Sequence, residues 1–332
     1  MDRDHRAIEL SGRLLRDESG LAWLREHVGG HATDVEHVQT LWSGYGEIAR
    51  VHLTGASVPS AIVKWVEPPQ IMEHPRGWTS RASHVRKLRS YRVEQCFYSD
   101  WIPDFHPSHR TAKCYHAEAT PHGWRFLLED LDASGFEQRH TSLNRTQINN
   151  CLGWLASFHA HFLNCKPKGL WETGTYWHLA TRADEFKALE DPQLRDAAHK
   201  LDHALNNCRY LTLVHGDAKV ANFCFGQDNV AAVDFQYVGA GCGIKDVAYF
   251  LSSCLTDREC KAQAPQHLET YFASLRVYLH DDVDKDAVIN EWRGLYPAAW
   301  ADFHRFLAGW APDHWKIHRY TRQMSEQALA EL

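Results

Sequence analysis

The sequence has little of what marks membrane, exported or disulfide-rich proteins. No apolar run approaches the ~20 residues of a membrane-spanning helix, and the first residues, MDRDHRAIEL, lack the apolar core of a signal peptide. The nine cysteines are odd in number, irregularly spaced and without a CxxC pair, which argues against a disulfide framework and a structural zinc site. We therefore expect a cytoplasmic protein with reduced cysteines and no membrane partner.

Other signals of function are missing as well. The chain has no internal repeat and neither a GxSxG nor an HExxH motif, so hydrolase and zinc-protease interpretations have no support. The formal net charge of −6 argues against nucleic acid as a partner. The rest is ordinary for a globular protein: 332 residues, 44% hydrophobic and 23% charged, enough for one large domain or two lobes.

Hydrophobic periodicity predicts a strand-rich front. Residues 3–28 should form one or two amphipathic helices, and residues 81–100 another helix. Short apolar runs between turn residues predict strands at 38–42, 49–53, 61–66, 113–119 and 124–128.

The back of the chain is predicted to be mainly helical. An apolar stripe begins at about residue 144. It is followed by a helix at 183–207, a strand at 211–214, a hairpin with strands at 223–225 and 230–233, and helices from about residue 245. This order favours two lobes with a cleft between them.

The most informative segment is VHGDAKVANF, residues 214–223, with VDFQ following at residues 233–236. Asp217 lies in the loop after a predicted strand, Asn222 lies where this loop meets the hairpin, and Asp234 ends the second hairpin strand. Two carboxylates and a carboxamide are hard oxygen ligands, and Mg²⁺ prefers a few such protein oxygens together with phosphate and water. The three side chains therefore suit a magnesium-phosphate site.

HGDxxxxN followed by a DFQ triplet resembles the aminoglycoside phosphotransferase and choline kinase group of the protein-kinase-like fold, and most of all its ecdysteroid-kinase-like branch. The resemblance extends from about residue 40 to residue 255. It implies an α+β, bilobal fold, with residues 1–131 as an N-terminal lobe built on an antiparallel sheet and one key helix. Residues 132–332 would form a larger, mainly helical lobe with the catalytic loop, metal site and acceptor pocket. ATP and Mg²⁺ are the cofactors it implies.

The same resemblance assigns roles within the loop. Asp217 would accept or orient the proton of the attacking hydroxyl, and Asn222 and Asp234 would hold Mg²⁺ on the phosphates. Lys219 would neutralise charge on the transferred phosphoryl, although many aminoglycoside kinases lack a lysine there. His215 is either a catalytic base or a scaffold for the loop, and we favour the scaffold because Asp217 already fills the base role.

The front half should then bind ATP. Lys64 lies inside an apolar strand, where its charge needs partners. The resemblance supplies the phosphates and Glu94, which opens a match to the family's ExxFY helix motif, so we predict a Lys64–Glu94 ion pair. The alternative is an edge strand with Lys64 in solvent. Gly44, Tyr45 and Gly46 would form the loop over the phosphates, which is a weak signal alone.

Three further positions have structural alternatives. The carbonyl of Glu129 and the N–H of Leu131 match the segment that binds adenine in the family, but a plain strand end would look the same. Asp246 begins a predicted helix, where an N-cap or loop anchor is favoured over a metal ligand. His159 and His161 have the wrong spacing to share one helix face, which argues against a metal site between them.

The acceptor pocket is predicted from aromatic residues. Tyr176, Trp177 and His178 lie in a short stretch of mixed aromatic and polar residues and are the best candidates for acceptor contact. Core packing is the commoner role for each, as it is for the other candidates: Trp154, Trp300, Trp310 and Trp315. An aromatic pocket would favour a bulky apolar alcohol or a quaternary amine.

We therefore expect an ATP- and Mg-dependent phosphotransferase that phosphorylates a hydroxyl group of a small-molecule alcohol. A non-catalytic, nucleotide-binding pseudokinase is one alternative, which the complete set of motif residues disfavours. A protein kinase is another, which is disfavoured because the loop carries HGD and no APE-type segment follows Asp234.

Overall fold

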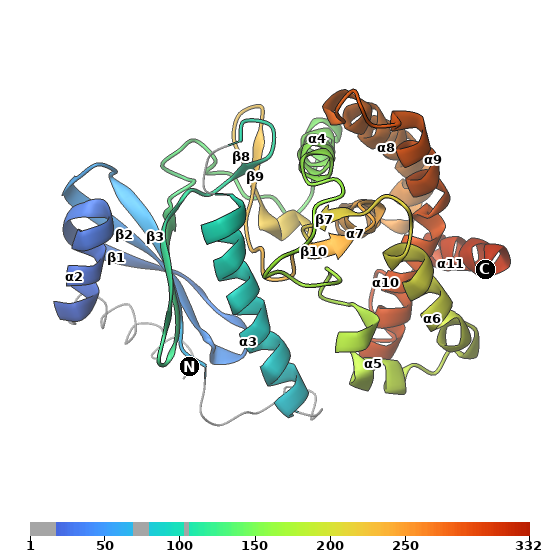
Figure 1. Ribbon diagram of the computed structural model, residues 1–332, viewed down its shortest axis with the longest axis horizontal. Helices are drawn as coiled ribbons and strands as arrows, with labels where there is room; N and C mark the ends of the chain where they lie inside the picture. The colour runs from blue at the N-terminus through green and yellow to red at the C-terminus, as the bar shows by residue number, and fades with distance from the viewer. Residues whose placement is uncertain (1–17, 69–79, 103–105) are drawn as a thin grey trace. The chain divides into compact units, whose positions relative to one another are not determined.

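The computed structural model describes residues 18–68, 80–102 and 106–332. The chain divides into two compact units (Figure 1). The first unit contains the chain up to residue 105 together with residues 111–138, and the second contains residues 106–110 and 139–332. The short strand β4 (Arg110–Thr111) lies where the chain passes back from the second unit to the first.

The first unit is built on a five-stranded antiparallel sheet in the order β1-β2-β3-β6-β5. Its strands, in chain order, are β1 (Gly29–Thr40), β2 (Gly46–Ala56), β3 (Ser60–Val66), β5 (Cys114–Thr120) and β6 (Gly123–Glu129). The predicted strand at 38–42 is thus the end of a longer strand, and Trp42 already begins the 3₁₀ turn η1 (Trp42–Gly44).

One helix packs against each of the two faces of this sheet (Figure 1). Helix α2 (Glu18–Val28) packs Trp23 and Leu24 into an apolar cluster that includes Val63 of β3. Successive strand residues point to opposite faces, so Lys64 faces the other way and meets helix α3 (Ser80–Cys96). A π-helical turn, η2 (Phe97–Trp101), extends α3. Of the predicted N-terminal helical segment, residues 3–17 lie outside the described residues.

The second unit is mainly helical, which together with the antiparallel sheet confirms the predicted α+β class. Its helices are α4 (Arg145–His161), α5 (Ala183–Ala188), α6 (Pro192–Asn206), α7 (Ile244–Cys254), α8 (Asp257–Tyr278), α9 (Lys285–Gly294), α10 (Tyr296–Trp310) and α11 (Arg319–Glu331). Short strands pair as β7 (Thr212–Val214) with β10 (Gly239–Gly241) and β8 (Phe223–Phe225) with β9 (Val230–Ala232). Two 3₁₀ turns, η3 (Leu179–Thr181) and η4 (Val220–Asn222), complete the unit.

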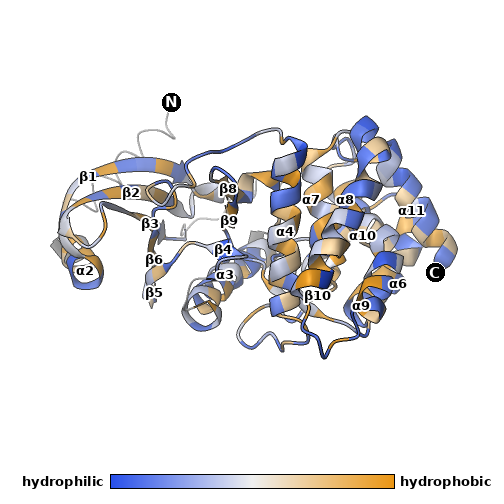
Figure 2. Cartoon of the chain, turned by 90° about the horizontal axis from the view of Figure 1, so that it is seen from above, coloured by the Kyte–Doolittle hydropathy of each residue, from blue (hydrophilic) through white to orange (hydrophobic). Residues whose placement is uncertain are grey.

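Local sequence explains where the helices of the second unit begin. Asn144 and Gln147 form a capping box at the start of α4, whose predicted apolar stripe is buried while its other side is polar (Figure 2). The single helix predicted at 183–207 is wrong, because the chain breaks into α5 and α6 at Leu189. Asp191 caps α6 and Pro192 stands in its first turn, where a missing N–H is tolerated.

The described residues bear on two expected absences, those of membrane-spanning helices and of disulfide bonds. Among them, no helix combines the length and apolar character that crossing a membrane requires. All nine cysteines fall in this part of the chain, and all nine are free thiols, as predicted. Burial raises the pKa of several of them, Cys114 to about 12 among them, so they behave as small apolar side chains.

Candidate active site

The loop after β7 turns at a glycine that no other residue could replace without rearrangement. Gly216 has φ +80°, and a Cβ atom on it would lie 2.2 Å from the carbonyl oxygen of Tyr237. The turn brings Asp217 out of the strand, with 7% of its surface exposed. The glycine of the HGD motif is therefore explained by close backbone packing.

A fully buried carboxylate on α7 holds this turn. The oxygens of Asp246 accept hydrogen bonds from the backbone N–H groups of His215 at 2.6 Å and Gly216 at 3.0 Å. A ring nitrogen of His159 lies 3.2 Å away, next to Tyr271. Asp246 is thus a loop anchor, one of its two predicted roles; the N-cap of α7 is Gly243 instead.

His215 has the predicted scaffold geometry. Its side chain is buried, and Nε2 lies 3.0 Å from the carbonyl oxygen of Val233, on the segment that leads to Asp234. Its Nδ1 accepts a hydrogen bond from the N–H of Asp217 at 3.3 Å. The imidazole therefore ties the two parts of the motif together.

The carboxylate of Asp217 collects three donors from different segments. Tyr249 of α7 donates its hydroxyl to Oδ1 at 2.9 Å. Lys219 Nζ lies 2.8 Å from Oδ2, and the Asn222 amide donates to Oδ2 at 3.2 Å and to the Asp217 backbone carbonyl at 2.8 Å. These contacts hold the carboxylate in one orientation.

Asn222 and Asp234 fit a hard cation in chemistry. Because the Asn222 amide nitrogen donates to Asp217, its carbonyl oxygen is the atom left to coordinate. Asp234 has φ +70°, a left-handed conformation that costs a non-glycine residue about 1–2 kcal/mol. Such strain persists where surrounding structure enforces it and is frequent at functional sites. These oxygens are the ligand type that Mg²⁺ prefers.

Lys219 remains a cation in this cluster. Burial acts to lower its pKa, but the neighbouring carboxylates of Asp217 and Asp234 outweigh burial, and the pKa is raised above its usual value. The side chain is 39% exposed, so its end can leave Asp217 without crossing packed core. Lys219 therefore meets the two requirements of a residue that neutralises phosphoryl charge, a firm positive charge and freedom to move.

Sequence reasoning missed two neighbours of Asp217. Burial and the nearby Asp217 carboxylate raise the pKa of Tyr249 well above its usual value, so this residue stays a hydroxyl donor. Lys316 Nζ lies 4.8 Å from the centroid of the Tyr249 ring. Burial lowers the pKa of Lys316 to about 8, although Asp217 opposes this effect. No motif spacing links either residue to the loop, so a single sequence offered no signal for them.

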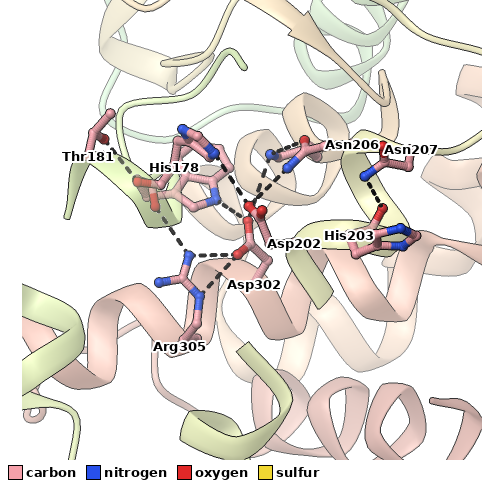
Figure 3. Close-up of polar contacts among 10 residues, drawn as sticks. His178, Thr181, Asp202, His203, Asn206, Asn207, Asp302 and Arg305 are labelled. Atoms are coloured by element: carbon pink, nitrogen blue, oxygen red, sulfur yellow. Dashed lines mark hydrogen bonds and ion pairs between the residues drawn. The ribbon is translucent and has the colours of Figure 1, made fainter. Parts of the chain in front are cut away.

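The three predicted acceptor contacts have different environments. Tyr176 adjoins the loop: its N–H donates to the Gly216 carbonyl at 3.0 Å, and its ring centroid lies 5.6 Å from that of Tyr249. Trp177 is fully buried and donates to Asp302 at 2.9 Å. His178 turns toward Asp202 at 3.5 Å (Figure 3). Trp177 and His178 thus belong to a structural network.

That network fixes the segment next to the loop. Arg305 of α10 pairs with Asp302 at 2.6 Å and donates to the Trp177 carbonyl at 3.2 Å. Lys245 Nζ lies 3.9 Å from Asp302, so the buried carboxylate is compensated on two sides. Figure 3 shows these contacts converging between α6, α10 and the 177–181 segment.

In the first unit, the predicted Lys64–Glu94 ion pair is present. Lys64 Nζ lies 2.7 Å from both oxygens of Glu94, and the two residues are 4% and 1% exposed. The solvent-facing alternative for Lys64 is therefore wrong. The β3 register places Lys64 opposite Phe126, and the lysine also lies 5.6 Å from the centroid of the Tyr91 ring.

The predicted phosphate loop is a tight turn between β1 and β2. Within it, Gly44 N donates to Leu41 O at 3.1 Å and Tyr45 N to Trp42 O at 3.4 Å. Gly46 has φ +137°, and a Cβ there would lie 1.9 Å from the Trp65 carbonyl oxygen. The Tyr45 hydroxyl lies 2.7 Å from His84 Nδ1 of α3, so this side chain anchors the turn.

The predicted adenine segment begins at the end of β6. Glu129 accepts hydrogen bonds from the Lys113 backbone N–H at 2.9 Å and the Ser134 hydroxyl at 2.6 Å. The Leu131 carbonyl oxygen accepts from the N–H of Phe136 at 2.9 Å, inside a turn. Between them, buried Asp130 pairs with Arg50 of β2 at 2.8 Å, which fixes the strand end to the sheet.

The model of the ecdysteroid kinase-like family matches residues 71–172 and 170–281, more than half of the 332 residues. The chain belongs to the ecdysteroid kinase-like family. The matched segments of this ecdysteroid kinase-like protein contain Asp217, Asn222 and Asp234, whereas Lys64 precedes them. No curated protein sequence matches the chain significantly.

Solved structures share the fold of this ecdysteroid kinase-like protein. One is choline kinase from Cryptosporidium parvum Iowa II, with a TM-score of 0.51 and 12% identity over 95% of this chain and 94% of that one. Another is a mutant aminoglycoside 2'-phosphotransferase-IIIa in its GDP complex, with a TM-score of 0.50 and 10% identity over 98% and 96%. At such identities the likeness establishes the protein-kinase-like fold and leaves the activity to be argued from the site.

Proposed function

We propose that this protein is a phosphotransferase that uses ATP and Mg²⁺ to phosphorylate a hydroxyl group of a small-molecule alcohol. The observation that carries the proposal is the convergence of Tyr249, Lys219 and Asn222 on the Asp217 carboxylate, in the family-matched segment. A half-exposed lysine beside an anchored carboxylate suits phosphoryl transfer, in which positioning and charge neutralisation supply most of the catalysis.

Each residue has a defined part in this proposal. Asp217 orients the acceptor hydroxyl and takes its proton as the acceptor oxygen bonds to the γ-phosphorus of ATP, while the bond from this phosphorus to the bridging oxygen breaks and ADP leaves. Lys219 leaves Asp217 Oδ2 for the phosphoryl oxygens, which frees that carboxylate oxygen for the acceptor. Asn222 and Asp234 would hold Mg²⁺, which supplies charge neutralisation on the phosphates when bound.

The first unit is proposed to bind the nucleotide. Lys64, kept in place by Glu94, would pair with phosphate oxygens. The 44–46 turn would contribute less than its glycines suggest, because the N–H groups of Gly44 and Tyr45 are already bonded within the turn. The adenine contact remains assigned to the backbone of Glu129 and Leu131.

The acceptor is proposed to approach beside Tyr176. The Asp217 carboxylate interacts electrostatically with three groups in this region: Tyr176, Tyr249 and Lys316. Trp177 and His178 are not proposed as acceptor contacts, because their polar atoms are engaged with Asp302 and Asp202.

The test is a screen for Mg-ATP consumption over sterols, amino alcohols, sugars and aminoglycosides, followed by kinetics on the best acceptor. Asp217→Asn should lower kcat by about 10²–10⁴-fold, the usual contribution of a positioned proton acceptor. Asp281→Asn is the matched control, because the Asp281 side chain is 98% exposed and contacts only Lys285. Undiminished turnover by Asp217→Asn would refute the role of Asp217.

A pseudokinase is the second candidate function. It would bind ATP at the same residues and transfer phosphate to no acceptor. A pseudokinase is disfavoured because the chain has all three motif residues, Asp217, Asn222 and Asp234. Nucleotide binding by the wild-type protein without turnover across the whole screen would favour it over the enzyme.

A further inference from the structure

Three histidines of the second unit form a cluster apart from the Asp217 loop. His106 and His109 come from the segment before β4, and His161 comes from the last turn of α4. One ring nitrogen of each lies within 4.8 Å of one ring nitrogen of the others. The ring centroids are 3.8 Å apart for His106 and His109, 4.9 Å for His109 and His161, and 5.2 Å for His106 and His161.

The hydrogen bonds of the cluster select the nitrogens that face a ligand. His109 is 2% exposed, and its Nδ1 lies 2.9 Å from the hydroxyl of Ser157 on α4. His106 Nδ1 accepts a hydrogen bond from the Ser108 backbone N–H at 3.3 Å. His109 therefore keeps Nε2 as its ligand atom when Nδ1 donates to Ser157, whereas the neutral His106 ring carries its proton on Nε2 and would coordinate through Nδ1. Hydrogen bonding at the far ring nitrogen is the usual way in which a protein orients a metal-binding imidazole.

We propose that His106, His109 and His161 bind one divalent transition-metal ion, with Zn²⁺ as the expected occupant. Three imidazoles and one open position make a common zinc coordination, and imidazole suits zinc better than it suits Mg²⁺ or Ca²⁺. Water would occupy the open position, because His161 is exposed and His106 is half-buried, so solvent reaches the cluster. The ion would fasten residues 106–110 onto α4.

Small side-chain movements complete the site. Zinc–nitrogen bonds of about 2.0–2.1 Å bring ligand nitrogens to about 3.4 Å from one another in tetrahedral geometry. The His106 and His109 rings are nearly parallel, at 15°, so the His106 ring must turn out of the stack and away from the Ser108 N–H for its Nδ1 to converge. Its half-buried position permits this turn, while His109 stays fixed by Ser157 and packs against Trp154 and Phe158.

The protonation state of the cluster favours a metal ion. Burial lowers the pKa of all three rings, that of His109 to about 3, and neighbouring rings of the cluster lower the pKa of His106 and His109 further. Neutral imidazoles have free lone pairs, so zinc need displace no proton at neutral pH. His159 is not part of the cluster, because its ring nitrogens contact Asp246 and Tyr271.

The test is a calorimetric titration of Zn²⁺ into the metal-free, full-length protein. One site per chain is expected, weakened at least about tenfold in His106→Gln and in His161→Gln, both of which alter accessible side chains. Ser157→Ala should weaken it by about 10–100-fold, the usual effect of losing a group that orients a ligand. His122→Gln, at an exposed histidine outside the cluster, should bind as the wild type does.

A spectroscopic readout separates this site from the other histidines and the cysteines. Co²⁺ in place of zinc should give the visible absorption of a four-coordinate site, and His161→Gln should remove it. Wild-type Zn²⁺ affinity in both His106→Gln and His161→Gln would overturn the proposal, as would the lack of any binding by the wild-type protein. Neither readout depends on phosphotransferase activity.

Discussion

At the residue scale, the Asp217 carboxylate is held by different donors at its two oxygens. Tyr249 occupies Oδ1 from inside the fold, while Lys219 and Asn222 occupy Oδ2. The tyrosine is 3% exposed, whereas the lysine side chain is 39% exposed. The Tyr249 contact is therefore the permanent one, and the Lys219 contact is the one that substrate binding can exchange.

Removal of the inner contact should impair the chemistry more than the fold. Tyr249→Phe deletes one hydrogen bond to a charged group, worth about 1.5–3 kcal/mol, so we expect kcat to fall about tenfold or more. Tyr278→Phe, at a residue 42% exposed, is the control. An unchanged kcat in Tyr249→Phe would contradict this role.

Lys316 is expected to lower the stability of the folded protein and to support turnover. Burial lowers its pKa from 10.5 to about 8, so at neutral pH the folded protein carries a buried ammonium at a cost of about 3 kcal/mol. The unfolded chain binds this proton more tightly than the folded chain, so the cost is complete below pH 8 and disappears as the pH rises toward 10.5. Lys316→Met should therefore be more stable than the wild type at neutral pH and should turn over the acceptor more slowly.

Urea unfolding of both proteins at two pH values checks this prediction. The stability gap should be as large as about 3 kcal/mol at neutral pH and should narrow between pH 8 and 10.5. Comparison with the variant at each pH cancels the titration of tyrosines and cysteines that the two proteins share. A gap that stays constant across this range would show that the Lys316 ammonium is not penalised by burial.

At the scale of elements, α7 carries both the anchor of the Asp217 loop and the inner donor to the Asp217 carboxylate. Asp246 in its first turn bonds the backbone of His215 and Gly216, and Tyr249 lies one turn later on the same helix. Residues three apart share a helix face, which explains why one helix can hold the loop at two points. The loop geometry should therefore depend on α7 more than on β7 itself.

Loss of the anchor should unfold this region. Asp246→Ala leaves two buried N–H groups and the His159 ring without their acceptor, which should cost about 3–5 kcal/mol of unfolding free energy. Asp246→Asn keeps one acceptor oxygen and should cost less. Asp313→Ala, at an exposed carboxylate, controls for the loss of a surface charge. Chemical denaturation measures all three, and equal stability of Asp246→Ala and wild type would contradict the anchoring role.

Elements with strong local signals could be predicted, and those decided by tertiary contacts could not. The stripe of α4 and the β8–β9 hairpin follow from apolar spacing and turn residues, and both are present. The break between α5 and α6 was missed although Pro192 marks it. Most of β1 was missed because its burial pattern is largely exposed, so its residues carry no apolar alternation.

The candidate site shows the same difference between residues with local sequence signals and residues placed by tertiary contacts. Motif spacing identified Asp217, Asn222 and the Lys64–Glu94 pair, because the sequence places them in recognisable segments. Tyr249 and Lys316 reach Asp217 only through the packing of α7 and the chain after α10. The histidine cluster likewise joins His161 to a segment about 50 residues earlier, which no local pattern reveals.

At the scale of the whole molecule, the proposed functions fall on different units. The Lys64–Glu94 pair lies in the first unit, while Asp217, Asn222 and Asp234 lie in the second. The family match covers parts of both units. The likeness in fold to choline kinase, at 12% identity, covers 95% of this chain and 94% of that one, and so extends over both units. Nucleotide binding and transfer should therefore be separable by mutation.

The most direct measurement is calorimetric binding of ATP with and without Mg²⁺, made in parallel with turnover. Asp217→Asn should bind Mg-ATP as the wild type does and transfer phosphate about 10²–10⁴-fold more slowly. Asp234→Asn should lose the difference between the two ATP titrations together with turnover, because Asp234 would hold the ion. Retention of Mg²⁺-dependent ATP binding and wild-type turnover by Asp234→Asn would contradict the account.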